Sequence, residues 1–267
     1  MVDLNKLKEK YASLAQKGGG NNQDFLDKFF MLKEGEAGVR ILPWDRDDQD
    51  FYAETAIHRI NGKNYHCPRV KDQECPVCDG YHAIWKQINA TGGRDAGNNS
   101  QLADLARGIK ANKRFYMNVI DRRTDDVKIL SMGQKLFTKI LSYLLNDDYI
   151  DEGKTVIDLA KGNDFKVVKK MIGGYPNYDE SAFRPKKTPA MESEGRIHAA
   201  MEQLHDIHSL VRVAEYSELK TLTDEAMAMV DMISGNTSSS PAGSSPAESS
   251  SEQGEDDYLS HLPKLDL

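Results

Sequence analysis

The stretch His58–Cys78, HRINGKNYHCPRVKDQECPVC, contains all three cysteines of the 267-residue chain. Two of them form the motif Cys75-Pro76-Val77-Cys78, and Cys67 precedes it. A Cys-x2-Cys motif places two thiolates at neighbouring, inward-facing positions of a tight turn, which suits tetrahedral Zn²⁺. Three reduced core cysteines would not account for this spacing. The stretch therefore predicts one structural Zn²⁺ that holds together a small, loop-rich subdomain at about residues 56–90.

The three cysteines need a fourth ligand, because a zinc site with an open position is typical of catalysis and no partner base is evident nearby. His66 is next to Cys67, and neighbours on a strand point to opposite faces, so these two do not easily share a metal. His82 lies one turn beyond the Cys-x2-Cys motif and is allowed if a helix begins there. His58 lies across an Asn61-Gly62 hairpin from Cys67, where one pleated face can present both. The geometry favours His58 and leaves His82 open.

Hydrophobic periodicity predicts a body of mixed α+β structure. Strands and helices do not alternate regularly along the chain, which argues against a doubly wound parallel sheet. The predicted strands lie at 39–43, 115–120 and 165–172, with a hairpin at 57–67, and the predicted helices lie near 102–109, 136–144, 197–207 and 219–233.

The charge of the whole chain argues against a nucleic-acid binder, since 35 Lys and Arg face 42 Asp and Glu for a net charge of −7. The charge is unevenly placed, however. Residues 234–267 hold six acids and one base, so −5 of the −7 lies there. Within the body, 107–123 carries six bases and one acid, and 161–187 carries seven bases and three acids. These two basic segments indicate a local site for an anionic partner.

Aromatic residues are interleaved with both basic segments. Single-stranded nucleic acid needs a positive groove that follows its phosphates and rings on which its bases stack. Phe115 alone is more typical of a core residue. Tyr175-Pro176-Asn177-Tyr178 follows a basic strand in a loop marked by Gly and Pro, and we expect its tyrosines to be exposed.

The two ends of the chain differ from the body. A helix over about 1–17 would place leucines and a tyrosine on one face, and the glycines at 18–20 follow it. Such a short helix is marginal in water and needs a surface, either its own body or another molecule. Residues 234–267 are first rich in Ser, Pro, Gly and Ala and then acidic with apolar residues between the acids, which favours a disordered docking tail over a purely solvating one.

Several function classes are disfavoured. The sequence shows no apolar run long enough for a membrane span and no signal peptide, so we expect a cytoplasmic protein. Gly153-Lys154-Thr155 lacks the first glycine of a phosphate-binding loop, and His205-Asp206-Ile207-His208 lacks the glutamate of a metalloprotease helix. We therefore expect no enzyme. Two alternatives stay open: a zinc-containing, nuclease-like enzyme acting on nucleic acid, and a scaffold that binds only proteins.

These motifs resemble a known family, the single-stranded DNA-binding, helix-destabilising proteins of T-even-type bacteriophages. The resemblance is carried by Val39–Pro43, by the cysteine segment, by Lys113–Tyr116 and most specifically by Asn177–Ser181 together with Phe183. It implies an OB-fold β-barrel core with the zinc subdomain on one side, and sequence-independent coating of single-stranded DNA. It also implies that the zinc ligands are His58, Cys67, Cys75 and Cys78.

The resemblance further implies three regions: an arm at 1–20 that contacts the next protomer along DNA, a core at 21–233, and a tail at 234–267 that recruits replication, recombination and repair proteins in the cytoplasm of the host cell. The implied DNA contacts are aromatic residues that line the cleft and the basic residues near them: Arg40, Lys110, Lys113, Arg114, Phe115, Tyr116, Lys169, Lys170, Tyr175, Tyr178 and Arg184. The arm residues are Leu4, Lys6, Leu7, Lys8, Lys10 and Tyr11. The tail anchors are Asp256, Asp257, Tyr258, Leu259, Leu262, Leu265 and Leu267. The spaced lysines of the arm depart from the family's compact Lys-Arg-Lys-type cluster, so we expect weaker cooperativity or cooperativity through the apolar face.

Overall fold

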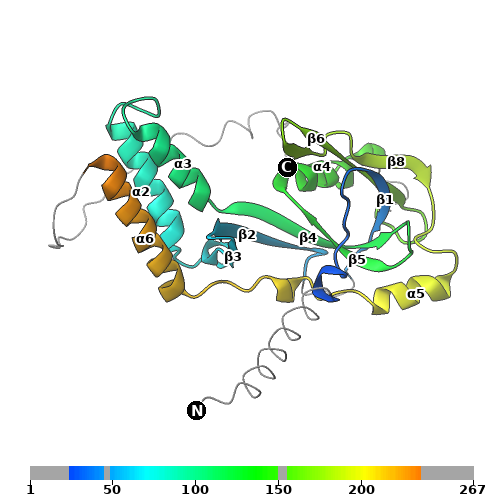
Figure 1. Ribbon diagram of the computed structural model, residues 1–267. Helices are drawn as coiled ribbons and strands as arrows, with labels where there is room; N and C mark the ends of the chain where they lie inside the picture. The colour runs from blue at the N-terminus through cyan, green and yellow to red at the C-terminus, as the bar shows by residue number, and fades with distance from the viewer. Residues whose placement is uncertain (1–23, 45–48, 150–154, 236–267) are drawn as a thin grey trace, which may run out of the picture.

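The computed structural model describes residues 24–44, 49–149 and 155–235 (Figure 1). The residues predicted for the arm, Leu4 to Tyr11, and the anchors of the tail, Asp256 to Leu267, lie outside the described residues.

The core of the protein is an antiparallel sheet organised around a long strand, β4 (Asn112–Asp121). One edge of β4 pairs first with β2 (Tyr52–Ile60) and then, through its last residues, with β1 (Gly35–Ile41). Its other edge pairs with β5 (Val127–Met132). Because strands twist, a long strand that changes partners along its length makes the sheet curl.

A second long strand, β6 (Asn163–Ile172), pairs with β1 and continues the sheet (Figure 1). It also pairs with β7 (Tyr175–Asn177) and β8 (Ala182–Lys187). The result is a curled half-barrel, which agrees with the OB-type core expected from the sequence. One local expectation is corrected here. The segment from Tyr175 is the returning strand of a tight hairpin rather than a loop, because Gly173-Gly174 supplies the two positive φ angles that such a turn requires.

The main hydrophobic core lies between one face of the half-barrel and α4 (Gln134–Leu144). Leu136, Phe137 and Ile140 of this helix are buried at helical spacing. The ring of Phe137 stacks on Phe115 of β4, with 3.8 Å between centroids. Burying a side chain of this size contributes about 1.5–3 kcal/mol, so this face of β4 is committed to the core.

A second core gathers around the cysteine segment. It joins the hairpin of β2 and β3 (Lys63–His66) to α2 (Pro76–Ala90), α3 (Asn99–Ile109) and α6 (Tyr216–Ser234), and Figure 1 shows the three helices side by side. We call this unit the metal lobe. It is larger than the subdomain predicted at 56–90, because α3 and α6 bury their apolar faces in the same cluster.

The helix α6 approaches α2 closely at one point. A Cβ added to Gly80 of α2 would stand 2.9 Å from Cγ2 of Thr223, closer than real Cβ atoms come to another atom. Glycine at this position therefore lets α6, which lies more than a hundred residues later in the chain, cover the metal lobe.

The remaining elements are short. Helix α5 (Glu194–Glu202) begins at Ser193, whose side chain accepts a hydrogen bond from the Arg196 amide, and it ends before the residue 207 that periodicity suggested. Within the described ranges, 3-10 turns lie at Pro68–Lys71, Asp147–Tyr149 and His208–Leu210. Among the described residues, no helix combines the length and the apolar character that crossing a bilayer needs. The predicted α+β class is confirmed.

Candidate metal centre and nucleic-acid interface

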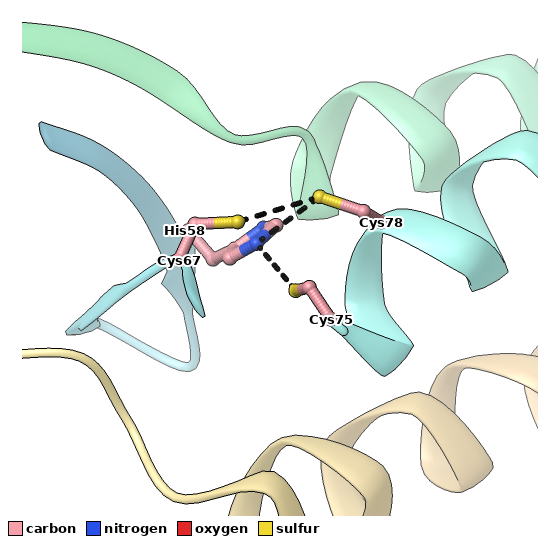
Figure 2. Close-up of side chains that lie close together, drawn as sticks. All are labelled: His58, Cys67, Cys75 and Cys78. Atoms are coloured by element: carbon pink, nitrogen blue, oxygen red, sulfur yellow. Dashed lines mark hydrogen bonds between the residues drawn. The ribbon is translucent and has the colours of Figure 1, made fainter. Parts of the chain in front are cut away.

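Four side chains converge where α2 begins (Figure 2). His58 comes from β2, Cys67 follows β3, Cys75 is the residue before α2, and Cys78 lies in its first turn. Their ligand atoms all lie within 4.8 Å of one another. The Nε2 atom of His58 is 3.3 Å from Sγ of Cys75 and 3.7 Å from Sγ of Cys78, and the Sγ atoms of Cys67 and Cys78 are 3.5 Å apart. Tetrahedral zinc places such atoms about 3.5–3.8 Å apart, so the cluster fits one metal ion.

Local geometry explains this convergence. Asn61 and Gly62 have φ of +51° and +75°, the values of a two-residue hairpin turn. This turn pairs His58 with Tyr65, two residues before Cys67, and side chains two apart on a strand share a face. The Cys67 amide also donates to the Ala56 carbonyl at 2.7 Å, which extends the pairing. The hairpin thus presents His58 and Cys67 together, as the sequence predicted.

The orientation of His58 is fixed by a hydrogen bond on its far side. Its Nδ1 lies 2.7 Å from the carbonyl oxygen of Ile109, the last residue of α3, which can only accept. Nδ1 therefore carries the proton, and Nε2 directs its lone pair at the three sulfurs. The imidazole is fully buried, and a closed set of one nitrogen and three sulfurs is typical of a structural rather than a catalytic zinc site.

Without a metal, the electrostatics of the cluster favour a protonated His58 and a thiolate at Cys75, whereas hydrogen bonds with Cys67 and Cys75 raise the pKa of Cys78. Burial opposes the protonation of His58, but hydrogen bonds with Cys67 and Cys75 outweigh it and raise the pKa of His58 to about 9. The pKa of Cys75 is lowered by hydrogen bonds from Cys67 and Cys78, against the opposing effect of burial. Cys75 and Cys78 also lie at the N-terminus of α2, where partial positive charge stabilises anions.

The other two histidines lie outside the cluster. His66 turns its Nδ1 to the hydroxyl of Thr55, 2.7 Å away, on the opposite face of the hairpin. Burial lowers the pKa of His66. His82 is exposed on α2, beside Arg69. The choice between His58 and His82, which the residues alone left open, is therefore decided for His58.

The predicted basic residues at the start of β4 are exposed. Lys113 pairs with Glu54 of β2 at 3.0 Å, and the ammonium of Lys110 lies over the ring of Tyr81 at 5.9 Å. Among the residues that the structure describes, the guanidinium of Arg114 has no ion pair or hydrogen bond. An exposed and unpaired arginine is available to a phosphate group.

Two separately predicted segments meet at Arg114. Burial against the barrel core raises the pKa of Tyr178, and the positive charge of Arg114 lowers it. An interaction of this kind requires the two side chains to be close, although 64 residues separate them. Tyr178 is half-buried, whereas Tyr175 is 78% exposed. The fold therefore brings Arg114 and Tyr178 together, and the exposed Tyr175 lies three residues before Tyr178 in the chain.

The predicted basic contacts on β6 and β8 differ from one another in exposure and in their partners. Lys170 forms a surface ion pair with Glu180, and Lys169 is half-buried with its ammonium donating to the Leu32 carbonyl at 3.0 Å. Arg184 is exposed, and its side chain has no ion pair or hydrogen bond to any other described residue. Of these three cations, Arg184 is the most accessible to a ligand.

Three predicted contacts need correction. Arg40 is fully buried, donating to Asp164 at 3.0 Å and to the Thr188 carbonyl at 2.7 Å, and it cannot reach a phosphate in this conformation. Phe115 and Tyr116 are 3% and 8% exposed, so neither ring offers a face to a base. The reason is that β4 is covered on both sides, with Phe115 in the main core and Tyr116 against Phe29.

Sequence reasoning missed other tyrosines around the same core. Tyr52 of β2 lies 4.8 Å from Phe137 between ring centroids, and Tyr143 of α4 lies 5.2 Å from Phe183. Both pack against the main core with part of the ring exposed. The sequence of β2, YAETAIHRI, groups its polar and apolar residues in pairs rather than alternating them, so no period-two signal indicated Tyr52.

The fold and the site define a class of protein: an antiparallel half-barrel joined to a lobe built around a closed His/Cys3 metal site. A family model described as "gp32 DNA binding protein like" matches residues 33–230. This match spans most of the chain, and the chain belongs to that family. The resemblance found in the sequence is thereby confirmed.

Curated relatives agree with this assignment. The "Single-stranded DNA-binding protein" of Enterobacteria phage T2 is 24% identical over 251 residues, covering 85% of this chain and 78% of its own length. The "Single-stranded DNA-binding protein" of Enterobacteria phage T4 is 23% identical over 224 residues, covering 74% of this chain and 68% of its own length.

Proposed function

We propose that this protein coats single-stranded DNA without sequence specificity and catalyses no reaction. The observation that carries the proposal is the approach of the exposed Arg114 to Tyr178, in a member of a DNA-binding family. The exposed Tyr175 lies three residues before Tyr178 in the chain. Exposed cations neutralise phosphates while unpaired bases stack on the rings. Neither interaction reads the edge of a base, which accounts for the absence of sequence preference.

In this proposal the metal is Zn²⁺ and its role is structural. His58, Cys67, Cys75 and Cys78 would hold it, and when bound it links the hairpin of β2 and β3 to α2 through four ligand bonds. The protein's own contribution is the buried Ile109 carbonyl that orients His58. The same residue immediately precedes the basic segment at Lys110, so the metal lobe supports part of the proposed DNA surface.

The arm and the tail supply the partners. We propose that Leu4, Lys6, Leu7, Lys8, Lys10 and Tyr11 of the arm contact the next protomer along the DNA, which makes binding cooperative. The tail, with anchors Asp256, Asp257, Tyr258, Leu259, Leu262, Leu265 and Leu267, recruits replication, recombination and repair proteins in the host cytoplasm. Its charge of −5 competes with DNA for the basic surface, so deleting 234–267 tightens binding at low salt.

Binding of oligo(dT) tests the central proposal. Quenching of the protein's fluorescence is measured against salt, with oligonucleotides long enough for one protomer and for several. We expect log K to fall with log[salt] at about −0.7 per neutralised phosphate. Tyr175→Ala weakens binding by about 1–3 kcal/mol. Tyr216→Ala, at a half-exposed tyrosine on α6, is the matched control and leaves affinity unchanged.

Two results would contradict the proposal. Failure of the wild-type protein to bind oligo(dT) at any salt concentration favours a scaffold that binds only proteins. Turnover of labelled DNA by the metal-loaded protein favours a nuclease-like enzyme. The four protein donors of the metal site leave no position for a substrate, which speaks against the latter.

A further inference from the structure

The strand β8 is an edge of the sheet whose charged side chains are all positive. It pairs with β6 and with no other described strand, and Figure 1 shows it beside β6. Its sequence, AFRPKK, holds three cations and no acid, and its last four residues are exposed. Edge strands are often protected by lysine and proline, so charge alone would not indicate a site. The shape of β8 and the pairing of the acid opposite it go beyond such protection.

The middle of β8 bulges away from β6. Four steps along β8, from Phe183 to Lys187, match two along β6. The amide Nδ2 of Asn163, a residue of β6 that is 6% exposed, donates to the carbonyl of Arg184 at 2.9 Å and to that of Pro185 at 3.3 Å. A buried side chain therefore holds the bulge in place, and bulges of this kind redirect the side chains that they carry.

The acid opposite the bulge is already neutralised. Asp164 lies on β6 between the two residues that pair with β8, and its carboxylate accepts from Arg40 at 3.0 Å and from Arg122 at 2.7 Å. The side chains of Arg184 and Lys186 form no ion pair or hydrogen bond with another described residue. Two unpaired cations, held two residues apart on an exposed bulge, favour an anionic ligand from outside the molecule.

The side chain of Arg184 extends from β8 across the sheet. A Cβ added to Gly38 of β1 would stand 3.7 Å from its Nη2 atom, so the guanidinium lies over β1, on the far side of β6. Lys166 of β6 is directly opposite Gly38, and its ion pair with Glu36, at 3.6 Å, is exposed. Exposed pairs contribute little, so Lys166 can also serve another anion. We call Arg184, Lys186 and Lys166 the β8 patch.

The β8 patch lies far from the contact between Arg114 and Tyr178. The same Cβ on Gly38 would stand 3.5 Å from Cγ of Arg122, so Arg184 lies beside Arg122. Arg122 comes directly after β4 and eight residues after Arg114, about 26 Å further along the extended strand. At about 3.4 Å per nucleotide of a stacked strand, this distance corresponds to about seven nucleotides. An OB-fold holds about 4–16 nucleotides, so one strand of DNA can reach both places.

We propose that the β8 patch is a second phosphate-binding site, which holds the backbone of single-stranded DNA after the strand has left Arg114 and Tyr178. The inference rests on the proposed function and adds a second anchor to it. A compact anion reaches only one of the two cation sites, whereas a row of phosphates reaches both. Phosphate contacts carry no sequence information, in keeping with coating that ignores sequence.

The test measures how the salt dependence of binding changes with oligonucleotide length. The full-length protein is compared with Arg184→Gln/Lys186→Gln, the bulge variant, and with a control, Lys86→Gln/Arg94→Gln. The control removes the same two charges from exposed residues of the metal lobe. Fluorescence quenching by dT4 and by dT12 is followed against salt, and all three proteins should keep the same melting temperature.

The two lengths should give different results. Since dT4 is too short to reach both sites, we expect the bulge variant to bind it within about twofold of wild type. For dT12 the slope of log K against log[salt] should become shallower by about 0.7 for each cation removed. The control variant should bind both oligonucleotides as wild type does.

Several outcomes would overturn the inference. A dT12 slope equal to wild type does so, and so does an equal change in the control variant, which would reflect net charge alone. Equal losses with dT4 and dT12 would make the patch part of the site at Arg114. Tighter binding of dT12 would mean that the patch holds the acidic tail instead of DNA. Self-association with unchanged DNA binding would mean that β8 only protects the edge of the sheet. Failure of the wild-type protein to bind either oligonucleotide overturns the proposed function itself.

Discussion

The Nδ1 atom of His58 and the carbonyl oxygen of Ile109 are 2.7 Å apart, and this hydrogen bond joins the metal cluster to the end of α3. The chain then passes directly into Lys110 and β4, which carries Arg114. The orientation of a metal ligand and the placement of the basic segment are thus set by the same buried contact.

Metal removal follows from this contact. Chelation of the metal removes the four bonds that link the hairpin of β2 and β3 to α2, and we expect the metal lobe to lose its cooperative unfolding transition. Calorimetry of the metal-loaded and chelated protein measures this effect. Unfolding of the lobe would separate the Ile109 carbonyl from His58, and we expect affinity for oligo(dT) to fall as well. Unchanged stability after verified metal loss would contradict a structural role, and Cys78→Ser provides an independent check.

The close approach of α6 to α2 predicts a specific steric effect. Gly80→Ala introduces a Cβ 2.9 Å from Cγ2 of Thr223, and overpacking of this kind costs about 1–3 kcal/mol in free energy of unfolding. Adding Thr223→Ser to the Gly80→Ala variant removes that methyl group and retains a hydroxyl that donates to the Leu219 carbonyl. The double variant should recover most of the lost free energy of unfolding. Gly108→Ala, on α3 with open space around it, is the matched control. Urea unfolding of the four proteins distinguishes a steric clash from a general loss of helix quality.

Arg40 and Arg184 of the half-barrel have separable roles. Arg40→Met removes the hydrogen bonds to Asp164 and to the Thr188 carbonyl, while Asp164 keeps Arg122 as a partner. We expect it to lower the free energy of unfolding by about 1–3 kcal/mol, the cost of a buried acceptor left without a donor. Arg184→Met removes an exposed cation and should leave stability within about 0.5 kcal/mol. For DNA binding the larger effect belongs to Arg184→Met, which should reduce the dependence of oligo(dT) affinity on salt concentration more than Arg40→Met does. A loss of stability in Arg184→Met as large as in Arg40→Met would show that both arginines are structural.

Asp121 provides a pH dependence of stability. Burial would raise its pKa, but hydrogen bonds from Arg123 outweigh burial and lower it. A carboxyl group whose pKa is lower in the folded protein stabilises the fold above its unfolded pKa of about 3.9, and that stability is lost as the pH falls through the folded value. Asp121→Asn should therefore be less stable than wild type at pH 7, with a difference that shrinks below about pH 4. Urea unfolding at pH 7, 4 and 2.5 measures this difference; a constant gap would exclude Asp121 as its source.

Features set by residues close in sequence could be predicted, whereas contacts between distant segments could not. The Asn61-Gly62 turn and the cysteine spacing sufficed to predict the hairpin and the three cysteine ligands, because these features are set by residues close in sequence. They favoured His58 as the fourth ligand without excluding His82. Two features escaped. Alternation along β4 indicates a strand but does not show that both faces are covered, so it could not exclude the contacts at Phe115 and Tyr116 that the family resemblance implied. The return of α6 onto Gly80 is non-local, and nothing in the periodicity of either helix specifies its partner.

The strand β2 belongs to both halves of the molecule. At Tyr52 its side chain packs against the core of the half-barrel, and six residues later His58 points into the metal cluster. Between them, β2 is bonded to β4 along most of its length. A strand shared in this way resists bending between the half-barrel and the metal lobe, because a hinge there would break several backbone hydrogen bonds at once. The half-barrel and the metal lobe should therefore bind a ligand as one rigid body, with a preformed binding surface and no closure of one part onto the other.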